Sequence, residues 1–412
     1  MQRDDHYDPE TICHSAFHAS SFLIGNRAPD SPRTCLCVAG SHYVRCSIIR
    51  LTPNFAGRTT ANTMSKASKI KQFDPNGPGN AQAGIYGLPF TAEESDIVLV
   101  PVPWEVTTSY GGGTAQGPEA MMDASFQVDL FHPEFPDLWK RGIAMDEIPA
   151  ALMEQSDALK KESVHVIDLL VNGGGKGKQE RAAKALKLVN EESAVMNDWV
   201  EQRTGFWLDQ GKLVGLVGGD HSTPLGLYHA LAKRHEGFGI LHFDAHLDLR
   251  RAYEGFTHSH ASIMFNALAI PQVEHIVSVG IRDFCEEEAR VFAREKLRVR
   301  IHRGAELRRE QYEGMTWREQ CDRIIGQLPE KVHISFDIDA LNPSLCPHTG
   351  TPVPGGFAFE EATYLLSRLA NSGKTIIGFD LVEVTPGPHG DWDANVGARL
   401  LWHLCGVLAK AQ

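Results

Sequence analysis

Short apolar runs alternate with longer segments of helical periodicity from residue 96 to the end of the chain. The runs have the length and bulky composition of buried strands, and the segments between them are long enough for helices. The predicted strands lie at 96–103, 213–217, 239–243, 275–279, 332–336 and 375–379. Strands that alternate with helices in this way form a parallel sheet with helices on both faces, so the pattern predicts an α/β fold.

Two glycine-rich segments interrupt the helical regions. Residues 130–205 have helical patterning that breaks at 172–177. The apolar row that we expect to pack on the sheet consists of Leu186, Val189, Val195 and Trp199. The other segment, residues 111–113, precedes an expected helix start at Gly117 and Pro118. It lacks the spacing of a P-loop, so we interpret it as a plain flexible loop rather than a phosphate cradle.

The first 63 residues differ from the remainder. They show no helical or strand periodicity, and residues 31–63 contain no acidic side chain. This composition is similar to that of a transit peptide, but the acidic residues among the first thirty fit such a peptide poorly. Met64 is an alternative start of the chain. We therefore predict a leader or disordered extension of unassigned role at 1–63 and a single domain at 64–412.

Composition excludes several classes of function. The 52 acidic and 40 basic side chains give a formal charge of −12, which argues against a nucleic-acid or anionic-membrane surface. No apolar run approaches the roughly 20 residues of a transmembrane helix, and we find no secretory signal, so we expect a cytoplasmic protein.

The eight cysteines are interpreted as free thiols, because Cys35 and Cys37 alone are a weak zinc signal.

Asp244, His246 and Asp248 follow the predicted strand 239–243 at every second position. Side chains at that spacing share one face of an extended chain. Two carboxylates and an imidazole that converge on one point are costly to bury unless a cation compensates them, which favours a metal site. The alternative is a polar strand end whose aspartates cap the following helix.

Two further strand ends carry the same kinds of side chain. His221 follows the strand 213–217, beyond two glycines that allow a close backbone approach, and Asp337 and Asp339 follow the strand 332–336. The carboxyl ends of parallel strands meet at one edge of a sheet. Four carboxylates gathered there would repel one another, whereas two divalent cations would offset them. The two imidazoles and four carboxylates therefore predict a binuclear metal centre.

The motifs around these residues resemble those of the ureohydrolase family, which contains arginases, agmatinases, guanidinobutyrases, guanidine hydrolases and formimidoylglutamases. Five motifs occur in the family's order, at 218–222, 244–248, 335–339, 350–356 and 378–386. The resemblance implies a three-layer α/β/α fold with a parallel sheet of about eight strands. It also implies a binuclear centre that usually holds manganese, and assembly as a homotrimer or homohexamer.

The resemblance further implies a role for each metal ligand. One metal would be held by His221, Asp244, Asp248 and Asp337, and the other by Asp244, His246, Asp337 and Asp339. Asp244 and Asp337 would bridge the two. This chain departs from many members at Asn342, where they have an aspartate. Because that position holds no metal in the family, we expect this chain to retain the metal centre. Only a local turn or hydrogen bond should differ.

The expected chemistry assigns further residues. A guanidinium carbon is a poor electrophile, so its hydrolysis needs an activated water, which two divalent ions supply by lowering the pKa of water. We assign the orientation of the planar cation to Glu383 and protonation of the amine leaving group to His260, with His258 as its near rival. Asp248 is counted among the catalytic residues as well as among the ligands.

The substrate stays open. The loop 250–257 lacks the Ser-Gly-Asn-type sequence with which arginases bind the amino-acid end of arginine, which disfavours arginine. Arg250 could pair with a substrate carboxylate, as in guanidinobutyrate or formimidoylglutamate, whereas His260 is typical of guanidino hydrolases. Aromatic side chains either restrict the pocket to free guanidine or simply pack: Trp104, Tyr253 and Phe256. The predicted substrate-binding set is Glu383, Arg250, His258, Thr351 and Tyr253.

We therefore predict an agmatinase-like hydrolase that releases urea from a small cationic substrate: agmatine, guanidinobutyrate or free guanidine. The enzyme alternative is a formimidoylglutamase, which would release formamide. The alternative from another class is a binding or assembly protein on the same fold. Manganese is the expected metal and nickel the alternative, since both accept imidazole and carboxylate ligands.

Overall fold

The computed structural model describes residues 34–39, 42–47, 64–80, 82–388 and 390–412, which fall into two units. In the first unit, β1 (Thr34–Ala39) and β2 (His42–Ser47) pair antiparallel. This pair corrects the expectation that residues 1–63 lack strands. The remainder of the predicted leader lies outside the described residues, as do the side chains of Cys35 and Cys37 and with them the weak zinc signal.

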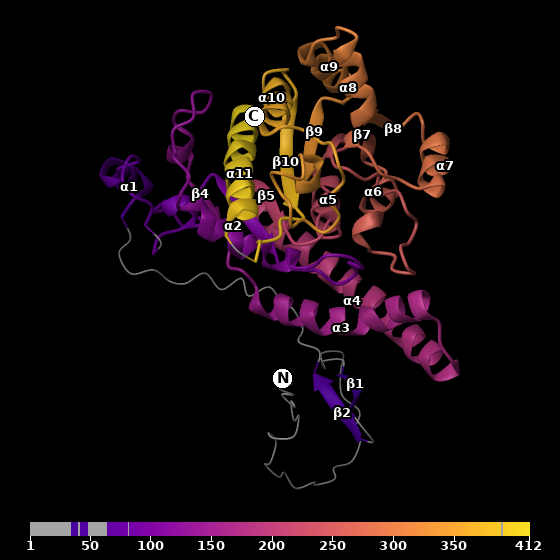
Figure 1. The fold of residues 1–412 in the computed structure, drawn as a ribbon. Coiled ribbons are helices and arrows are strands. Elements are labelled where there is room, and N and C mark those ends of the chain that lie inside the picture. Colours follow the sequence, from indigo (N-terminus) through magenta and orange to yellow (C-terminus); the bar gives the residue numbers. More distant parts are fainter. Residues whose placement is uncertain (1–33, 40–41, 48–63, 81, 389) are drawn as a thin grey trace, which may run out of the picture. The chain divides into compact units, whose positions relative to one another are not determined.

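The second unit is built on one sheet of eight parallel strands (Figure 1). In sheet order these are β4 (Ile143–Met145), β3 (Ile97–Val102), β5 (Leu213–Gly218), β10 (Thr375–Val382), β9 (Lys331–Asp337), β6 (Phe238–Phe243), β7 (Val273–Ile281) and β8 (Val299–Arg303). The predicted α/β fold is confirmed. The apolar runs did not reveal β4, which has three residues, or β8, which carries arginines and a histidine.

Helices cover both faces of the sheet. Their bounds are α2 (Gly117–Ser125), α3 (Ala150–Asn172), α4 (Lys176–Asp209), α5 (Leu225–Ala232), α6 (Ile263–Ala267), α7 (Glu286–Arg294), α8 (Gly304–Tyr312), α9 (Trp317–Ile325), α10 (Phe359–Ala370) and α11 (Trp392–Lys410), with α1 (Lys66–Gln72) preceding them. Alternate strand residues enter different cores: Ile97 and Leu99 pack with α2 and α8 to α11, and Val98 and Val100 pack with α3 to α7. The second unit therefore has three layers.

Helices α3 and α4 form the predicted helical pair, and their break at residues 173–175 lies inside the expected glycine-rich segment. Val189 and Trp199 of α4 are buried, but Val195 is 42% exposed, so its assignment to the packed row is wrong. Six residues beyond Val189, Val195 is turned about 120° around the helix at 3.6 residues per turn. Met196 occupies the buried position instead.

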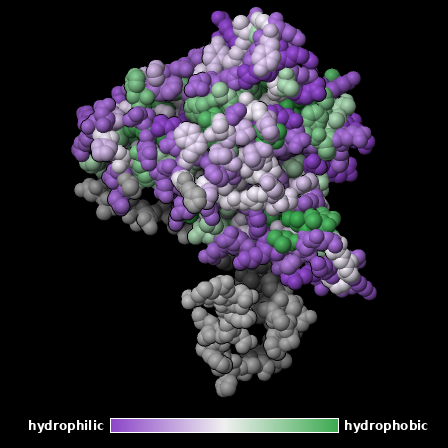
Figure 2. Space-filling view, viewed as in Figure 1, coloured by the Kyte–Doolittle hydropathy of each residue, from purple (hydrophilic) through white to green (hydrophobic). Residues whose placement is uncertain are grey.

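The central strands β5, β10, β9 and β6 are neighbours, and their carboxyl ends meet at one edge of the sheet. All predicted metal ligands lie at or beyond the carboxyl ends of three of these strands, and Glu383 follows the fourth. The surface seen in Figure 2 is mostly hydrophilic. Within the described ranges, no helix is both long and apolar enough to cross a membrane.

Candidate metal centre

The turn after β5 carries His221 to the edge of the sheet. Gly219 donates its N–H to Val102 and the Asp220 N–H donates to the Trp104 carbonyl, both at 2.9 Å. A Cβ atom on Gly219 would lie 2.0 Å from that carbonyl oxygen, so only glycine permits the approach. The close approach predicted from the two glycines is confirmed, and it leaves His221 fully buried at the strand end.

The segment after β6 places three donors without being a strand. Because β6 ends at Phe243, simple alternation does not explain where Asp244, His246 and Asp248 point. Instead, the N–H of His246 donates to Oδ1 of Asp244 at 2.6 Å, and Asp248 adopts a φ of 53°. A positive φ is uncommon outside glycine. It marks a locally strained backbone that persists only because the surrounding contacts hold it. The predicted convergence is present, but a tight turn produces it.

The end of β9 supplies the last two carboxylates. Asp337 is the final residue of the strand, and its Oδ1 accepts the N–H of Asp339 at 2.8 Å. Oδ1 of Asp339 in turn accepts the N–H of Ala245 at 2.9 Å. These backbone hydrogen bonds fix the carboxylates and connect the β9 end to the β6 end, which lies beside it in the sheet.

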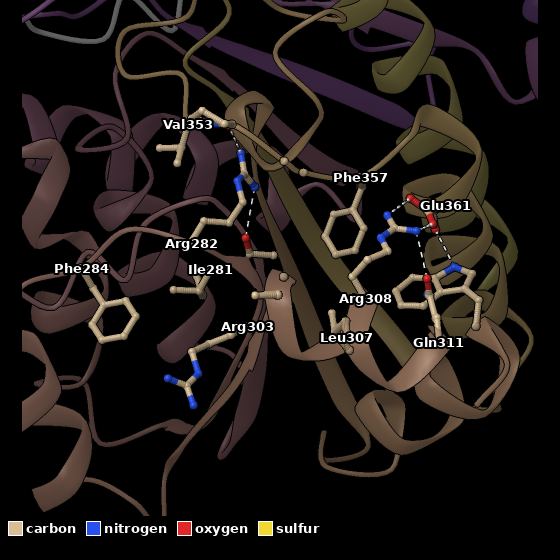
Figure 3. A pocket seen from close by; sticks show the side chains of 17 residues that line it. Ile281, Arg282, Phe284, Arg303, Leu307, Arg308, Gln311, Val353, Phe357 and Glu361 are labelled. Carbon is tan, nitrogen blue, oxygen red and sulfur yellow. Dashed lines mark hydrogen bonds and ion pairs between the residues drawn. The ribbon is translucent and has the colours of Figure 1, made fainter. Parts of the chain in front are cut away.

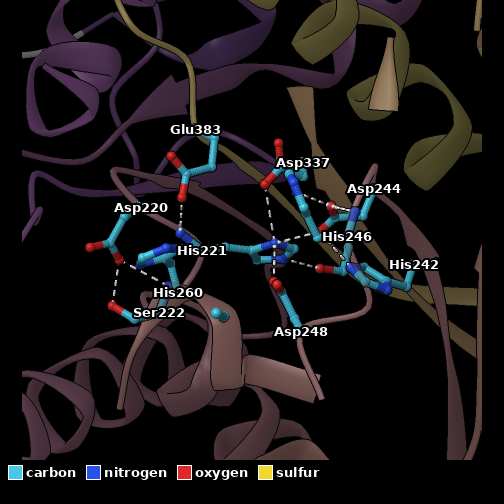
Figure 4. A network of polar contacts seen from close by, with 12 residues as sticks. Asp220, His221, Ser222, His242, Asp244, His246, Asp248, His260, Asp337 and Glu383 are labelled. Atoms are coloured by element: carbon cyan, nitrogen blue, oxygen red, sulfur yellow. Dashed lines mark hydrogen bonds and ion pairs between the residues drawn. The ribbon is translucent and has the colours of Figure 1, made fainter. Parts of the chain in front are cut away.

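Five of the six predicted ligands fall in two groups that share Asp244, and Asp337 lies beside His221 of the first group (Figure 4). Nδ1 of His221 lies 3.1 Å from Oδ2 of Asp244, and the nearest oxygens of Asp248 and Asp337 lie 3.2 and 3.3 Å from it. Nδ1 of His246 lies 3.0 Å from Oδ2 of Asp339 and 3.4 Å from Oδ1 of Asp244. The two oxygens of Asp244 therefore face different groups of donors.

The electrostatics of this cluster favour a bound cation. Burial, reinforced by the Asp244 charge, raises the pKa of Asp248 to about 6. Burial and the neighbouring Asp339 raise the pKa of Asp337 well above its usual range. Burial opposes ionisation of Asp244 too, but the adjacent His242 and His221 imidazoles hold its pKa well below the usual range. A set of buried carboxylate oxygens and imidazole nitrogens at this spacing fits divalent metal ions.

His242 is a member of this cluster that the sequence interpretation did not assign. Its Nε2 lies 2.8 Å from Oδ2 of Asp244, and its Nδ1 lies 3.1 Å from the Ser278 hydroxyl. The metal-type grouping of His221, Asp244 and Asp248 includes it. The signal was available, because His242 is the penultimate residue of the buried strand β6 and so lies at the strand end where the predicted donors gather.

A small cavity of about 180 Å³ opens onto the cluster. Nine of the predicted residues line it: His221, His246, Asp248, Arg250, Tyr253, His260, Asp337, Thr351 and Glu383. Ser109, Tyr110, Phe284 and Glu288 complete much of the wall, and sequence reasoning singled out none of these. Asp244 and Asp339 lie deeper, behind the lining.

Glu383 faces the metal ligands from the end of β10. It has a φ of 64°, its N–H donates to Gly219 at 2.8 Å, and its Oε1 accepts the N–H of His221 at 2.8 Å. Burial and the nearby Asp220 raise the pKa of Glu383 well above its usual range. A buried carboxylate at a cavity wall is thus held in place and lacks a cationic partner among the described residues.

Arg250, Tyr253 and His260 form another part of the wall. The Arg250 guanidinium lies 4.7 Å from the Tyr253 ring centre, and its Nε is 3.7 Å from Glu288. The Tyr253 ring meets His260 edge-on at 5.9 Å. Burial and the neighbouring His246 lower the pKa of His260 to about 4, so the imidazole is neutral at pH 7.

Other residues from the sequence analysis lie elsewhere. His258 lines a different cavity, with His229 and Lys233. Trp104 and Phe256 are fully buried and absent from the walls of the cavity beside the cluster, which matches their alternative interpretation as packing aromatics. Oδ1 of Asn342 accepts hydrogen bonds from the N–H and hydroxyl of Ser344 at 3.0 and 2.8 Å, so its effect is confined to a local turn.

A larger cavity of about 560 Å³ contains none of the predicted site residues (Figure 3). Its arginines are engaged within the protein. Arg308 pairs with both oxygens of Glu361, and Arg282 donates to the Val353 carbonyl. Arg282 also donates to the Asp339 carbonyl at 2.7 Å, so this cavity's wall supports a metal ligand rather than offering free charges.

Comparison with known proteins agrees with this geometry. The sequence model of the arginase family matches residues 95–406. The N(1)-aminopropylagmatine ureohydrolase of Thermus thermophilus is 30% identical over 320 residues, which cover 76% of this chain and 91% of that protein. The agmatinase of Bacillus anthracis is 27% identical over 295 residues, covering 71% and 85%.

A solved structure has the same fold. The agmatine ureohydrolase of Thermoplasma volcanium superposes with a TM-score of 0.60 at 22% identity, over 79% of this chain and 94% of that one. The predicted ureohydrolase resemblance is thereby confirmed by sequence and by fold. This chain belongs to the arginase family of ureohydrolases, which are hydrolases that act on C–N bonds.

Proposed function

We propose that the protein hydrolyses a small guanidino compound other than arginine and releases urea. The observation that carries this proposal is the relation between Asp244 and Glu383. Asp244 joins two groups of candidate metal donors, and the buried Glu383 lines a cavity of about 180 Å³ together with four of the donors. A metal centre beside a carboxylate without a cationic partner is the arrangement that a planar cation needs.

The donor set supports a binuclear centre. His221, Asp244, Asp248 and Asp337 would hold one ion, and Asp244, His246, Asp337 and Asp339 the other, with manganese as the expected metal and nickel as the alternative. When bound, the two ions would supply an activated water for attack on the guanidinium carbon. His242, beside Asp244, would orient that bridging carboxylate rather than bind the substrate.

Glu383 supplies the electrostatic contact to the substrate. Its raised pKa reflects a buried carboxylate that is unstable when ionised alone, so a guanidinium entering the cavity would stabilise the charged form. The carboxylate can accept two parallel N–H bonds from a guanidinium. Because Oε1 already accepts the His221 N–H, the bound guanidinium is held in a fixed relation to the metal ligands.

His260 lies at the cavity wall, where it can donate a proton to the leaving amine. An amine leaves readily only when protonated, and a histidine at the cavity wall can carry a proton to it. The imidazole is neutral at pH 7 and gives up an acquired proton easily, since burial and neighbouring imidazoles lower its pKa to about 4. Its Nδ1 lies 3.5 Å from the Thr107 hydroxyl, which helps to orient the ring.

The size of the cavity favours a small substrate. Its volume of about 180 Å³ lies below the roughly 300–1,000 Å³ of typical drug-sized sites. The names of the relatives concern agmatine and aminopropylagmatine, which supports agmatine-like compounds, and the small volume supports guanidinobutyrate or free guanidine as well. Assembly as a homotrimer or homohexamer in the cytoplasm is part of the same proposal.

A second candidate rests on Arg250. This side chain lines the cavity and is 32% exposed, so its guanidinium could bind a substrate carboxylate. A formimidoylglutamase would use it in that way and would release formamide. Glu288, 3.7 Å from Arg250, partly neutralises its charge, which weakens this candidate against the guanidino substrates.

The test is a product assay across substrates. Urea and formamide release would be measured with guanidine, agmatine, guanidinobutyrate, arginine and formimidoylglutamate, using protein loaded with manganese and, separately, with nickel. We expect urea from one of the guanidino compounds other than arginine. Formamide from formimidoylglutamate alone would favour the second candidate, and absence of both products would refute enzyme function of either kind.

A further inference from the structure

A buried carboxylate outside the metal cluster holds the loop that forms one wall of the cavity. Glu105 follows β3, its side chain is 5% exposed, and it accepts the N–H groups of Gly113 and Thr114, both at 2.5 Å. The hydroxyls of Thr114 and Thr108 donate to it at 3.0 and 3.1 Å. Residues 111–113 form a loop, as predicted, and Gly113 at its end is anchored to an anion that the protein itself supplies.

Two residues of helix α3 also bind Glu105. Nζ of Lys160 pairs with the Glu105 carboxylate and also contacts the Thr108 hydroxyl. The hydroxyl of Ser156, one turn earlier, accepts the Glu105 N–H at 2.8 Å and is buried. Residues four apart lie on the same face of a helix. One face of α3 thus holds both the main chain and the side chain of Glu105.

The loop that Glu105 holds lines the cavity and contacts His260. Ser109 and Tyr110 line the catalytic cavity, and Thr107 lies beside His260. Gly111 has a φ of 71°, and a Cβ atom there would lie 2.7 Å from the Gly350 carbonyl oxygen. Glycines leave a loop many conformations. The position of this wall is therefore set by the contacts to Glu105 and not by the preferences of the loop.

We propose that Lys160 and Glu105 are positioning residues for substrate binding. By tying the loop to α3, the ion pair fixes the wall formed by Ser109 and Tyr110 at the distance that the substrate requires. Without Lys160, the buried Glu105 would lose its cationic partner and the loop would leave this position. The inference rests on the proposed function only for the identity of the substrate.

The test begins with Lys160→Met, which removes the cation and keeps an unbranched side chain. We expect KM for the guanidino substrate to rise roughly 10- to 100-fold, since a misplacement of about 1 Å can cost that much. We expect kcat to fall by less and bound metal to stay at the wild-type level. Lys160→Arg should recover most of the lost affinity. Lys161→Met, at the exposed neighbouring position, is the matched control and should leave KM and kcat unchanged.

A second readout needs no substrate. Tyr110 is 74% exposed, and chymotrypsin can cleave after it only when the surrounding loop leaves its anchored conformation. Mass spectrometry should show faster cleavage after Tyr110 in Lys160→Met than in the wild type. A wild-type protein that releases no urea would refute the proposed function and leave this result standing, so the two failures are distinguishable.

Two outcomes would overturn the inference: Lys160→Met with wild-type KM and a wild-type cleavage rate, or loss of kcat and bound metal at unchanged KM. If Lys160→Met does not fold, Ser156→Ala serves instead, because it removes one hydrogen bond to Glu105. That variant should show smaller increases of KM and of the cleavage rate. Wild-type values of both would contradict the proposal equally.

Discussion

Nε2 of His221 lies 2.9 Å from the hydroxyl oxygen of Ser335, on the side of the ring opposite the carboxylate cluster. Ser335 donates its own hydrogen to Oδ1 of Asp380 at 2.9 Å, and Tyr228 donates to Ser335 at 3.0 Å. All four side chains are buried. A metal bound to Nδ1 of His221 would leave the proton on Nε2, and this chain of hydrogen bonds would then orient the ligand and make it a better electron donor.

Ser335→Ala should therefore weaken metal binding. The substitution leaves the Nε2–H of His221 without its acceptor in a buried site, and loss of such an outer partner lowers metal affinity by roughly 10- to 100-fold. The measurement is bound manganese after dialysis against a series of buffered metal concentrations. Activity should return when metal is added in excess.

A buried serine elsewhere provides the control for this experiment. Ser163 of α3 is fully buried and donates to the Lys160 carbonyl. Ser163→Ala removes the same atom from a comparable environment without touching a metal donor. If both variants retain metal equally well, Ser335 has no part in holding His221.

Glu383→Gln should impair substrate binding while leaving the metals in place. The amide oxygen of glutamine can still accept the N–H of His221, so the loop after β10 should keep its conformation. The negative charge opposite the substrate is lost, and a hydrogen bond to a charged group is worth about 1.5–3 kcal/mol. We expect kcat/KM to fall roughly 10- to 150-fold with unchanged bound metal. A wild-type kcat/KM would show that Glu383 does not contact the substrate.

His260→Ala and His258→Ala separate the two histidines of the loop after Asp248. His260 lines the catalytic cavity and His258 lines another, although they are two residues apart in the sequence. Loss of a positioned general acid costs typically 10²- to 10⁴-fold, so kcat of His260→Ala should fall within that range. His258→Ala should keep kcat close to wild type. Equal losses in both variants would contradict the assignment, and steady-state rates from pH 6 to 10 provide the comparison.

The sequence was sufficient for the donors but not for their geometry. The convergence of His221, Asp244, Asp337 and the other predicted donors could be foreseen because they lie at or shortly beyond the ends of buried strands, and parallel strands bring such ends together. Alternation along a strand was the wrong reason for Asp248, which reaches the cluster through a left-handed turn. Local backbone conformations of this kind depend on hydrogen bonds to distant segments, and periodicity contains no information about them.

The contacts of α3 with the loop after β3 also could not be predicted from the sequence. Lys160 and Glu105 are 55 residues apart, and nothing in either segment distinguishes this pair from a solvated lysine and a loop acid. Strands with weak apolar patterns were missed for a related reason. In β8, Val299 and Ile301 alternate with Arg300 and His302, and only Val299 and His302 are buried, so this edge strand lacks the continuous apolar run of the central strands.

His403 should make the protein less stable as the pH falls from about 6.5 to 4. This α11 residue is 5% exposed, its Nε2 lies 3.2 Å from the Ser367 hydroxyl and from the Thr363 carbonyl, and its ring packs edge-on against Phe135. Burial, together with the neighbouring His132, lowers the pKa of His403 to about 4, from 6.5 in the unfolded chain. The unfolded state therefore binds the proton more tightly, and stability present above pH 6.5 is lost as the pH approaches 4.

His403→Gln removes the titrating group and keeps a donor for the Thr363 carbonyl. Between pH 7 and pH 5, the free energy of unfolding of the wild type should fall by about 2 kcal/mol more than that of the variant, since each pKa unit corresponds to about 1.4 kcal/mol. Urea denaturation of both proteins at the two pH values measures this difference. Acid release of metal lowers the free energy of unfolding of both proteins equally, so this effect cancels in the comparison. Parallel pH dependence of the two proteins would show that His403 becomes protonated in the folded state as readily as in the unfolded chain.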